Sequence, residues 1–112
     1  MSAEILTLDG LAVPLRVLRL LAVDFGHLPA PDVQVSTVYP NRLELTFHNR
    51  LADFELWREA LGICADDVLY REQSNGRTRV LNTVTAYAGA ELELTGFGDI
   101  DTPAAVSAGG AA

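Results

Sequence analysis

The sequence predicts a two-layer α+β domain in which an antiparallel sheet of about five strands carries two helices on one face. Two observations indicate this class. The spacing of apolar residues changes along the chain between the helical period and the two-residue period of strands. Glycine, proline and asparagine separate the blocks. The predicted order is therefore helix, two strands, helix, three strands.

The first predicted helix covers residues 12–25, with Pro14 tolerated because it lies in the first turn. Two neighbouring rows of apolar residues cover more than half of its circumference and leave a narrow polar strip around Arg16 and Arg19. Such a helix is either central in the fold or covered by a second subunit. The preceding residues 5–8 are compatible with a short additional strand.

Alternating apolar and polar residues predict a hairpin of two strands, over residues 33–39 and 43–48. Asn49 is a good N-cap for a second helix over residues 50–61, and Gly62 suits the position just after its end. Three further strands are predicted, over residues 68–73, 77–87 and 91–97.

The dipeptide Asn75-Gly76 is a strong hairpin signal and predicts how two of these strands pair. A two-residue turn there places Glu72 opposite Arg79 and Arg71 opposite Val80. Arg71 then points to the face opposite Arg77 and Arg79, and Glu72 is expected to neutralise Arg79.

The chain is predicted to form one domain over residues 1–98, followed by a disordered tail over 99–112. Most residues of the tail are small or polar, and it offers little to bury.

The chain has 112 residues, a formal net charge of −7 and 49% hydrophobic residues. This hydrophobic content excludes disorder over most of the length. The acidic balance argues against a general nucleic-acid binder, although a locally basic patch stays compatible with it. All eight basic residues are arginine, which we interpret as the codon bias of a GC-rich bacterial genome.

A single cysteine, Cys64, cannot form an internal disulfide and favours a reducing compartment. The apolar run over residues 11–23 is short and interrupted by Pro14, Arg16 and Arg19, so no membrane span is predicted. The first residues lack the positive charge of a signal peptide. We therefore expect a cytoplasmic protein.

No constellation of catalytic residues stands out in the sequence. Cys64 has acidic neighbours, which disfavour a catalytic thiolate and favour a packed side chain. The carboxylates of Glu91 and Glu93 share one face of a strand, and His48 lies on an outward face with Glu44; both are read as solvated sheet surface. The sequence has neither a cysteine–histidine cluster for a metal nor a glycine-rich phosphate loop. We expect no cofactor and favour a non-enzymatic role.

Three functions stay open. The first is a binding or protein-interaction module that self-associates, as a homodimer for example, through apolar helix surface; the interface candidates are Leu15, Leu18, Leu21 and Leu56. The second is a small-ligand binder or enzyme with a pocket between helices and sheet; the lining candidates are Tyr39, His48, Trp57 and Tyr70. The third is a nucleic-acid accessory protein that uses the 71–79 hairpin; the contact candidates are Arg71, Arg77 and Arg79.

Overall fold

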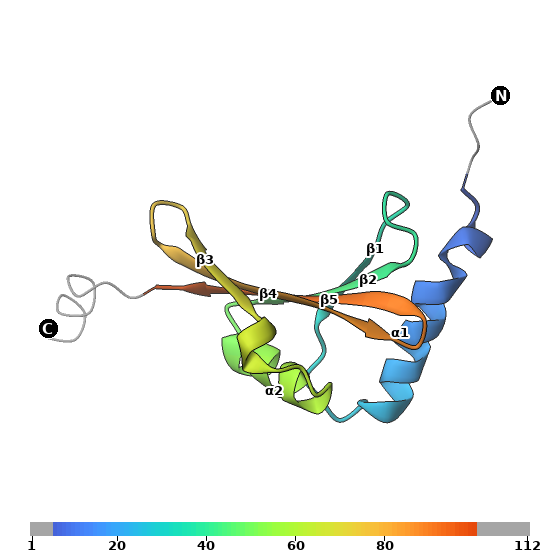
Figure 1. Ribbon diagram of the computed structural model, residues 1–112, viewed down its shortest axis with the longest axis horizontal. Helices are drawn as coiled ribbons and strands as arrows, with labels where there is room; N and C mark the ends of the chain where they lie inside the picture. The colour runs from blue at the N-terminus through green and yellow to red at the C-terminus, as the bar shows by residue number, and fades with distance from the viewer. Residues whose placement is uncertain (1–5, 101–112) are drawn as a thin grey trace, which may run out of the picture.

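A five-stranded sheet and two helices form two layers in the computed structural model, which describes residues 6–100 (Figure 1). The helices are α1 (Ala12–Asp24) and α2 (Leu51–Ala60), and both lie on the same side of the sheet. The strands are β1 (Asp32–Val35), β2 (Arg42–His48), β3 (Leu69–Gln73), β4 (Thr78–Tyr87) and β5 (Ala90–Asp99). The predicted α+β class and the order of elements are confirmed.

The sheet has the strand order β1-β2-β5-β4-β3 and is mixed rather than wholly antiparallel. β3, β4 and β5 form a meander, whose last strand lies between β4 and β2. β5 runs parallel to β2, with Leu43 beside Leu92 and Leu45 beside Leu94, while all other neighbours are antiparallel. The direction of β5 follows from the meander, because each tight hairpin reverses the chain.

The core lies between the sheet and the helices. β2 and β5 each present alternate side chains to the helices, and these side chains are buried. Phe47 of β2 meets Phe54 of α2 edge to face, with the ring centroids 6.2 Å apart. Gly96 gives α2 room, because a Cβ there would lie 3.1 Å from the Phe54 ring. The remaining core residues on α1, α2, β2 and β5 are Val17, Leu21, Trp57, Leu43, Leu45, Ala90, Leu92 and Leu94.

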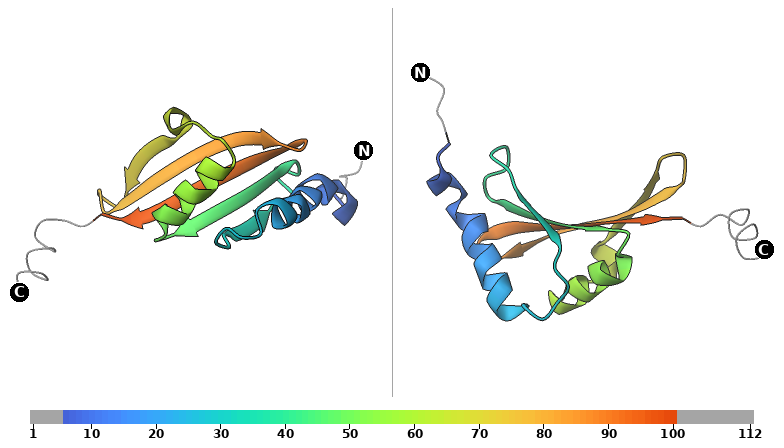
Figure 2. Two further views of the ribbon diagram at one scale, coloured as in Figure 1. Left: turned by 90° about the horizontal axis from the view of Figure 1, so that it is seen from below. Right: turned by 180° about the vertical axis from the view of Figure 1, so that it is seen from behind.

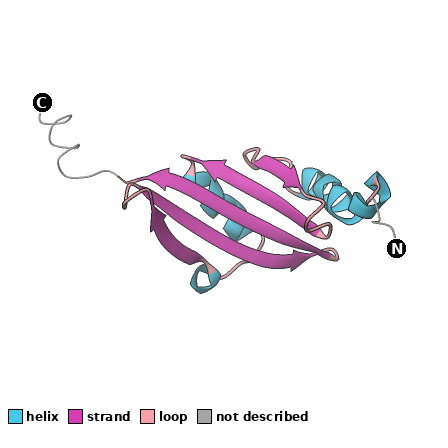
Figure 3. Cartoon of the chain, turned by 90° about the horizontal axis from the view of Figure 1, so that it is seen from above, coloured by secondary structure: helices cyan, strands magenta, loops and turns pink. Residues whose placement is uncertain are grey.

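α1 lies along the edge of the molecule next to β1, as two opposite views show (Figures 2 and 3). Pro14 is in its first turn, as predicted. Val17 and Leu21 are buried, whereas Leu20 and Val23 are exposed. α1 is therefore not a central helix, and one of the two predicted alternatives is wrong.

Several predicted boundaries differ from the structure. β1 ends at Val35 because the Val38 amide donates a hydrogen bond to the Ser36 hydroxyl at 3.0 Å, which turns the chain before Pro40. Leu8–Leu11 form a 3-10 helix, so residues 6–11 contain no strand; residues 1–5 lie outside the described part. Asn49 adopts a positive φ of 57° and Arg50 takes the N-cap position without a side-chain bond.

β5 also runs further than predicted, because the Ile100 amide bonds to the Arg77 carbonyl at 2.9 Å and holds the strand end against the β3–β4 turn. Asp99 consequently belongs to the sheet and not to a tail. The rest of the predicted tail, residues 101–112, lies outside the described residues.

Both tight hairpins place non-glycine residues in the left-handed region. Asn75 and Gly76 both have positive φ, as the predicted two-residue turn requires, and Ser74 before them has φ 59°. The β4–β5 turn has Ala88 at φ 50° followed by Gly89 at φ 90°. Alanine in the left-handed region costs roughly 1–2 kcal/mol, a strain that asparagine largely avoids.

Ala88→Asn should therefore raise the free energy of unfolding by about 0.5–1 kcal/mol. Chemical denaturation measures the change. The reverse substitution in the other hairpin, Asn75→Ala, should lower stability by a similar amount. An Ala88→Asn protein no more stable than the parent would contradict the strain at this turn.

Candidate functional site

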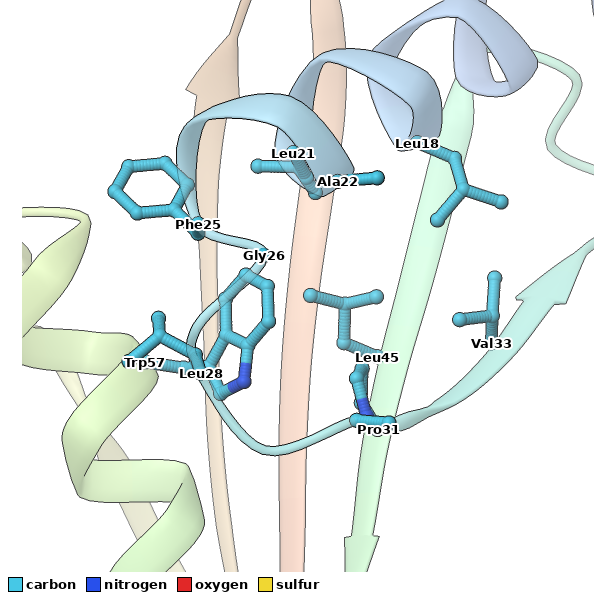
Figure 4. Close-up of a pocket in the computed structure, with 11 residues that line it drawn as sticks. Leu18, Leu21, Ala22, Phe25, Gly26, Leu28, Pro31, Val33, Leu45 and Trp57 are labelled. Carbon is cyan, nitrogen blue, oxygen red and sulfur yellow. The ribbon is translucent and has the colours of Figure 1, made fainter.

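An apolar cavity lies between the C-terminal half of α1, the loop that follows it, β1, β2 and one side chain of α2 (Figure 4). Its volume is about 240 Å³. All eleven lining residues are apolar, and the main contributors are Leu18, Leu21, Phe25, Val33, Leu45 and Trp57. The predicted pocket between helices and sheet thus has a counterpart in the structure, and Trp57 belongs to it.

The loop over residues 25–31, which lines the cavity, is held against α2 by hydrogen bonds. The Trp57 indole N–H donates a hydrogen bond to the Pro29 carbonyl at 2.7 Å, and Arg50 donates one to the Ala30 carbonyl at 3.1 Å. The Phe25 ring lies 6.0 Å from the Trp57 ring. The loop is held toward α2, so the space between α1 and β1 is left unfilled.

Apolar side chains continue from the cavity mouth onto the surface. Leu15 is 40% exposed and lies one turn before Leu18 on α1, and Val33 of β1 is 42% exposed. We call Leu15, Leu18, Ala22 and Val33 the α1–β1 strip. It lies along the edge of the sheet where, in the described part of the chain, β1 has no further strand beside it.

The four predicted interface leucines separate in the structure. Leu15 and Leu18 belong to the α1–β1 strip. Leu21 is buried in the core of its own chain, where it also lines the cavity. Leu56 is 45% exposed but lies on α2.

The other predicted ligand residues lie away from the cavity. His48 is on the helix-free face, where it stacks on Phe97 with ring centroids 5.2 Å apart and has Nε2 3.8 Å from a carboxylate oxygen of Asp32. Tyr39 lies before β2, with the Arg42 guanidinium 4.6 Å from its ring centroid. The structure therefore does not bring Tyr39 or His48 together with Trp57.

Tyr70 lies on the edge strand β3 and is also remote from the cavity lining. Its hydroxyl donates a hydrogen bond to Glu72 at 2.7 Å. This bond to a carboxylate raises the pKa of Tyr70, because ionisation would place two negative charges side by side.

Glu91 and Glu93 share the helix-free face, as predicted, and are bound by an arginine. Arg42 Nε donates to Glu91 at 3.0 Å, and Arg42 Nη1 lies 3.5 Å from Glu93. The hydrogen bond to Glu91, helped by the charge of Glu93, raises the pKa of Arg42. Asn82 donates to Glu93 at 2.9 Å. These contacts commit both carboxylates to a network that spans β2, β5 and β4.

The arginines of the 71–79 hairpin follow the predicted register. Glu72 is opposite Arg79 and Arg71 is opposite Val80, so Arg71 and Arg79 point to different faces. The expected charge pair does not form: within residues 6–100 no ion pair shorter than 4 Å joins Glu72 and Arg79. Glu72 is bonded to Tyr70 instead, and Arg79 Nε is buried with no hydrogen-bond partner among the residues that the structure describes.

Other sequence expectations concern Cys64 and metal binding. Cys64 is exposed rather than packed, since its neighbour Ile63 takes the buried position. Among the described residues, no group of three or more histidine, cysteine, aspartate or glutamate side chains is arranged to hold a metal ion.

The loop and strand residues that complete the cavity were not predicted from the sequence as ligand-binding residues; they are Phe25, Leu28, Pro31, Val33 and Leu45. Their alternation and apolar character indicate burial, but they do not indicate a space left between α1 and β1. The two prolines of the 26–31 loop were the available signal, because they favour an extended path away from the helix.

Comparison with known proteins adds no family: no protein-family model matches the chain, and no curated protein matches it significantly. In the region covered by the structure, no helix has the length and apolar character needed to cross a membrane.

Trp57→Phe tests whether the indole bond holds the 25–31 loop. Loss of this hydrogen bond and of part of the ring should lower the free energy of unfolding by about 1–2 kcal/mol. Amide hydrogen exchange should become faster in the loop and stay unchanged in β4 and β5. Arg50→Ala removes the more exposed bond and should have the smaller effect. Unchanged exchange in the loop of the Trp57→Phe protein would contradict this role.

Proposed function

We propose that this protein is a small non-catalytic interaction module that self-associates through the α1–β1 strip. The observation that carries the proposal is the position of exposed apolar side chains at the cavity mouth, along the free edge of the sheet. Contiguous apolar surface on a soluble domain is typical of interaction sites, since burying it is favourable by about 25 cal/mol per Å².

The placement of α1 supports this function. An amphipathic helix at the edge of a sheet normally exposes a polar face. α1 instead exposes Leu15, Leu20 and Val23, with Arg16 and Arg19 between them. Of the two explanations for an unusually apolar first helix, cover by a second subunit is the one compatible with its edge position.

The chemistry of the cavity supports a binding role over a catalytic one. Its apolar lining supplies no acid, base or nucleophile. The carboxylates that share a sheet face, Glu91 and Glu93, are bound to Arg42 on the helix-free face. His48 is also on that face, away from the cavity lining.

Leu15→Glu should weaken self-association at least about tenfold, because it places a charge in a surface that must lose its water. Light scattering coupled to size exclusion, over a range of protein concentrations, measures the oligomeric state. Leu56→Glu is the matched control, since Leu56 has a similar exposure on α2 and should leave association unchanged. A wild-type protein that stays monomeric at high concentration would contradict the proposal.

A second candidate function is the binding of a small uncharged apolar ligand in the cavity. The specific observation is the volume of about 240 Å³ with an all-apolar lining. An apolar cavity of roughly 150 Å³ is enough to admit benzene. The ring faces of Phe25 and Trp57 suit an aromatic or short aliphatic molecule.

An uncharged fluorescent probe such as N-phenyl-1-naphthylamine tests this candidate. We expect saturable enhancement of its fluorescence, weakened about tenfold or more by Ala22→Leu, which fills the cavity mouth from an exposed position. Ala86→Leu makes the same change at an exposed position of β4 that does not line the cavity, and should bind like the wild type. Equal binding by the Ala22→Leu protein would argue against the cavity as the site.

Nucleic-acid binding by the 71–79 hairpin has less support. Arg71 faces away from Arg79, and neutralising several phosphates needs basic groups on one surface.

A further inference from the structure

Among residues 6–100, the sheet has two free edges, β1 and β3, because each of these strands pairs on one side only. A free edge presents unpaired backbone N–H and C=O groups and is a template for another strand. The two edges lie at opposite ends of the sheet, and only β1 lies beside α1 (Figures 2 and 3). The side chains of each edge decide which one accepts a second copy of the same chain.

β3 is protected against pairing with itself. An antiparallel pair that uses all five residues of Leu69–Gln73 has its two-fold axis at Arg71, so Arg71 faces Arg71 of the second copy. Like charges directly opposite each other destabilise a strand pair. Charged residues on an exposed edge are a common device against edge-to-edge association.

β1 has a register in which a second copy fits. With the axis at Gln34, the two Gln34 residues face each other and Val33 of each copy faces Val35 of the other. Gln34 is opposite Glu44, on the helix-free face, whereas Val33 is opposite the buried Leu45 on the helix side. The valine pairs would therefore extend the apolar layer of one copy into the other, and the glutamine amides can bond to each other.

Competing registers of β1 are less favourable. Moving the axis to Val33 sets Val35 opposite Pro31, which has no backbone N–H to donate. A slip by one residue sets Val33 of one copy opposite Gln34 of the other. The helices of the two copies then lie on opposite faces of the joined sheet, and the apolar layers are separated. The axes at Val33 and Gln34 both keep the helices of the two copies on one side, but only the axis at Gln34 sets no proline opposite a residue of β1.

We propose that two copies of this chain pair antiparallel through β1, with the two-fold axis at Gln34, and form a continuous sheet across the dimer. This inference rests on the proposed self-association and specifies its geometry. β1 has only four residues, and a stable interface needs roughly 1,000 Å² or more. The α1–β1 strips of the two copies lie beside this seam and supply the remaining contact.

Substitution of Gln34 tests the register. Gln34→Lys sets two positive charges opposite each other only in the dimer, and within one chain it faces Glu44 and is tolerated. Sedimentation equilibrium should show association weakened about tenfold or more. Gln34→Glu should weaken it as well, but this variant also faces Glu44 within its own chain, so its effect is interpreted only together with the mixture. An equimolar mixture of the two variants should form a heterodimer at least as strong as the wild-type dimer, because lysine then faces glutamate.

Gln73→Lys is the matched control, since it makes the same change at an exposed position on the β3 edge and should leave association unchanged. Circular dichroism of each variant checks the fold, and recovery in the mixture separates loss of pairing from misfolding.

Undiminished association of Gln34→Lys, or a mixture that does not recover, would overturn the β1 pairing. If Leu15→Glu dissociates the protein while Gln34→Lys does not, self-association stands and only this geometry fails. A wild-type protein that is monomeric would contradict both the self-association and the β1 pairing.

Discussion

The central position of β5 is the constraint on which the rest of the structure depends. β5 pairs with β4 on one side and with β2 on the other, so it joins the C-terminal meander to the N-terminal hairpin in one sheet. Its helix-facing side chains change from Leu92 and Leu94 to Gly96 and Gly98. The leucines fill the core, and the glycines let α2 approach the sheet where a Cβ would collide with Leu51 and Phe54.

The edge position of α1 is a consequence of this arrangement. α2 covers the glycines of β5, and α1 packs on the same face of the sheet, against β2 and β5, with Val17 and Leu21. The loop between α1 and β1 is bound to α2 by the hydrogen bond from the Trp57 indole to the Pro29 carbonyl. The cavity and the α1–β1 strip have the same origin. α1 packs on the sheet with only one of its faces, and it carries more apolar residues than that face can bury.

The helix-free face and the β1 edge differ in their chemistry. On the helix-free face, Arg42, Glu91, Glu93 and Asn82 satisfy one another in a network in which Arg42 and Glu93 are largely covered and Glu91 is exposed. At the β1 edge, no strand within residues 6–100 pairs with the outer side of β1, and exposed apolar side chains lie beside it. Groups that lack partners within the chain are the ones that can gain from a partner outside it, which is why the candidate interaction surface lies at the edge.

Local patterns along the chain were enough to predict the two helices, the hairpins and the Glu72–Arg79 register, because each depends on residues close together in sequence. Trp57, Leu18 and Leu21 were predicted as functional residues and line the cavity, whereas Tyr39, His48 and Tyr70 do not. The parallel pairing of β5 with β2, the edge position of α1 and the cavity were decided by the tertiary structure alone. An apolar pattern indicates that a side chain prefers burial. Contacts between segments distant in sequence decide which side chain finds a partner, and they bury Leu21 and leave Leu15 exposed.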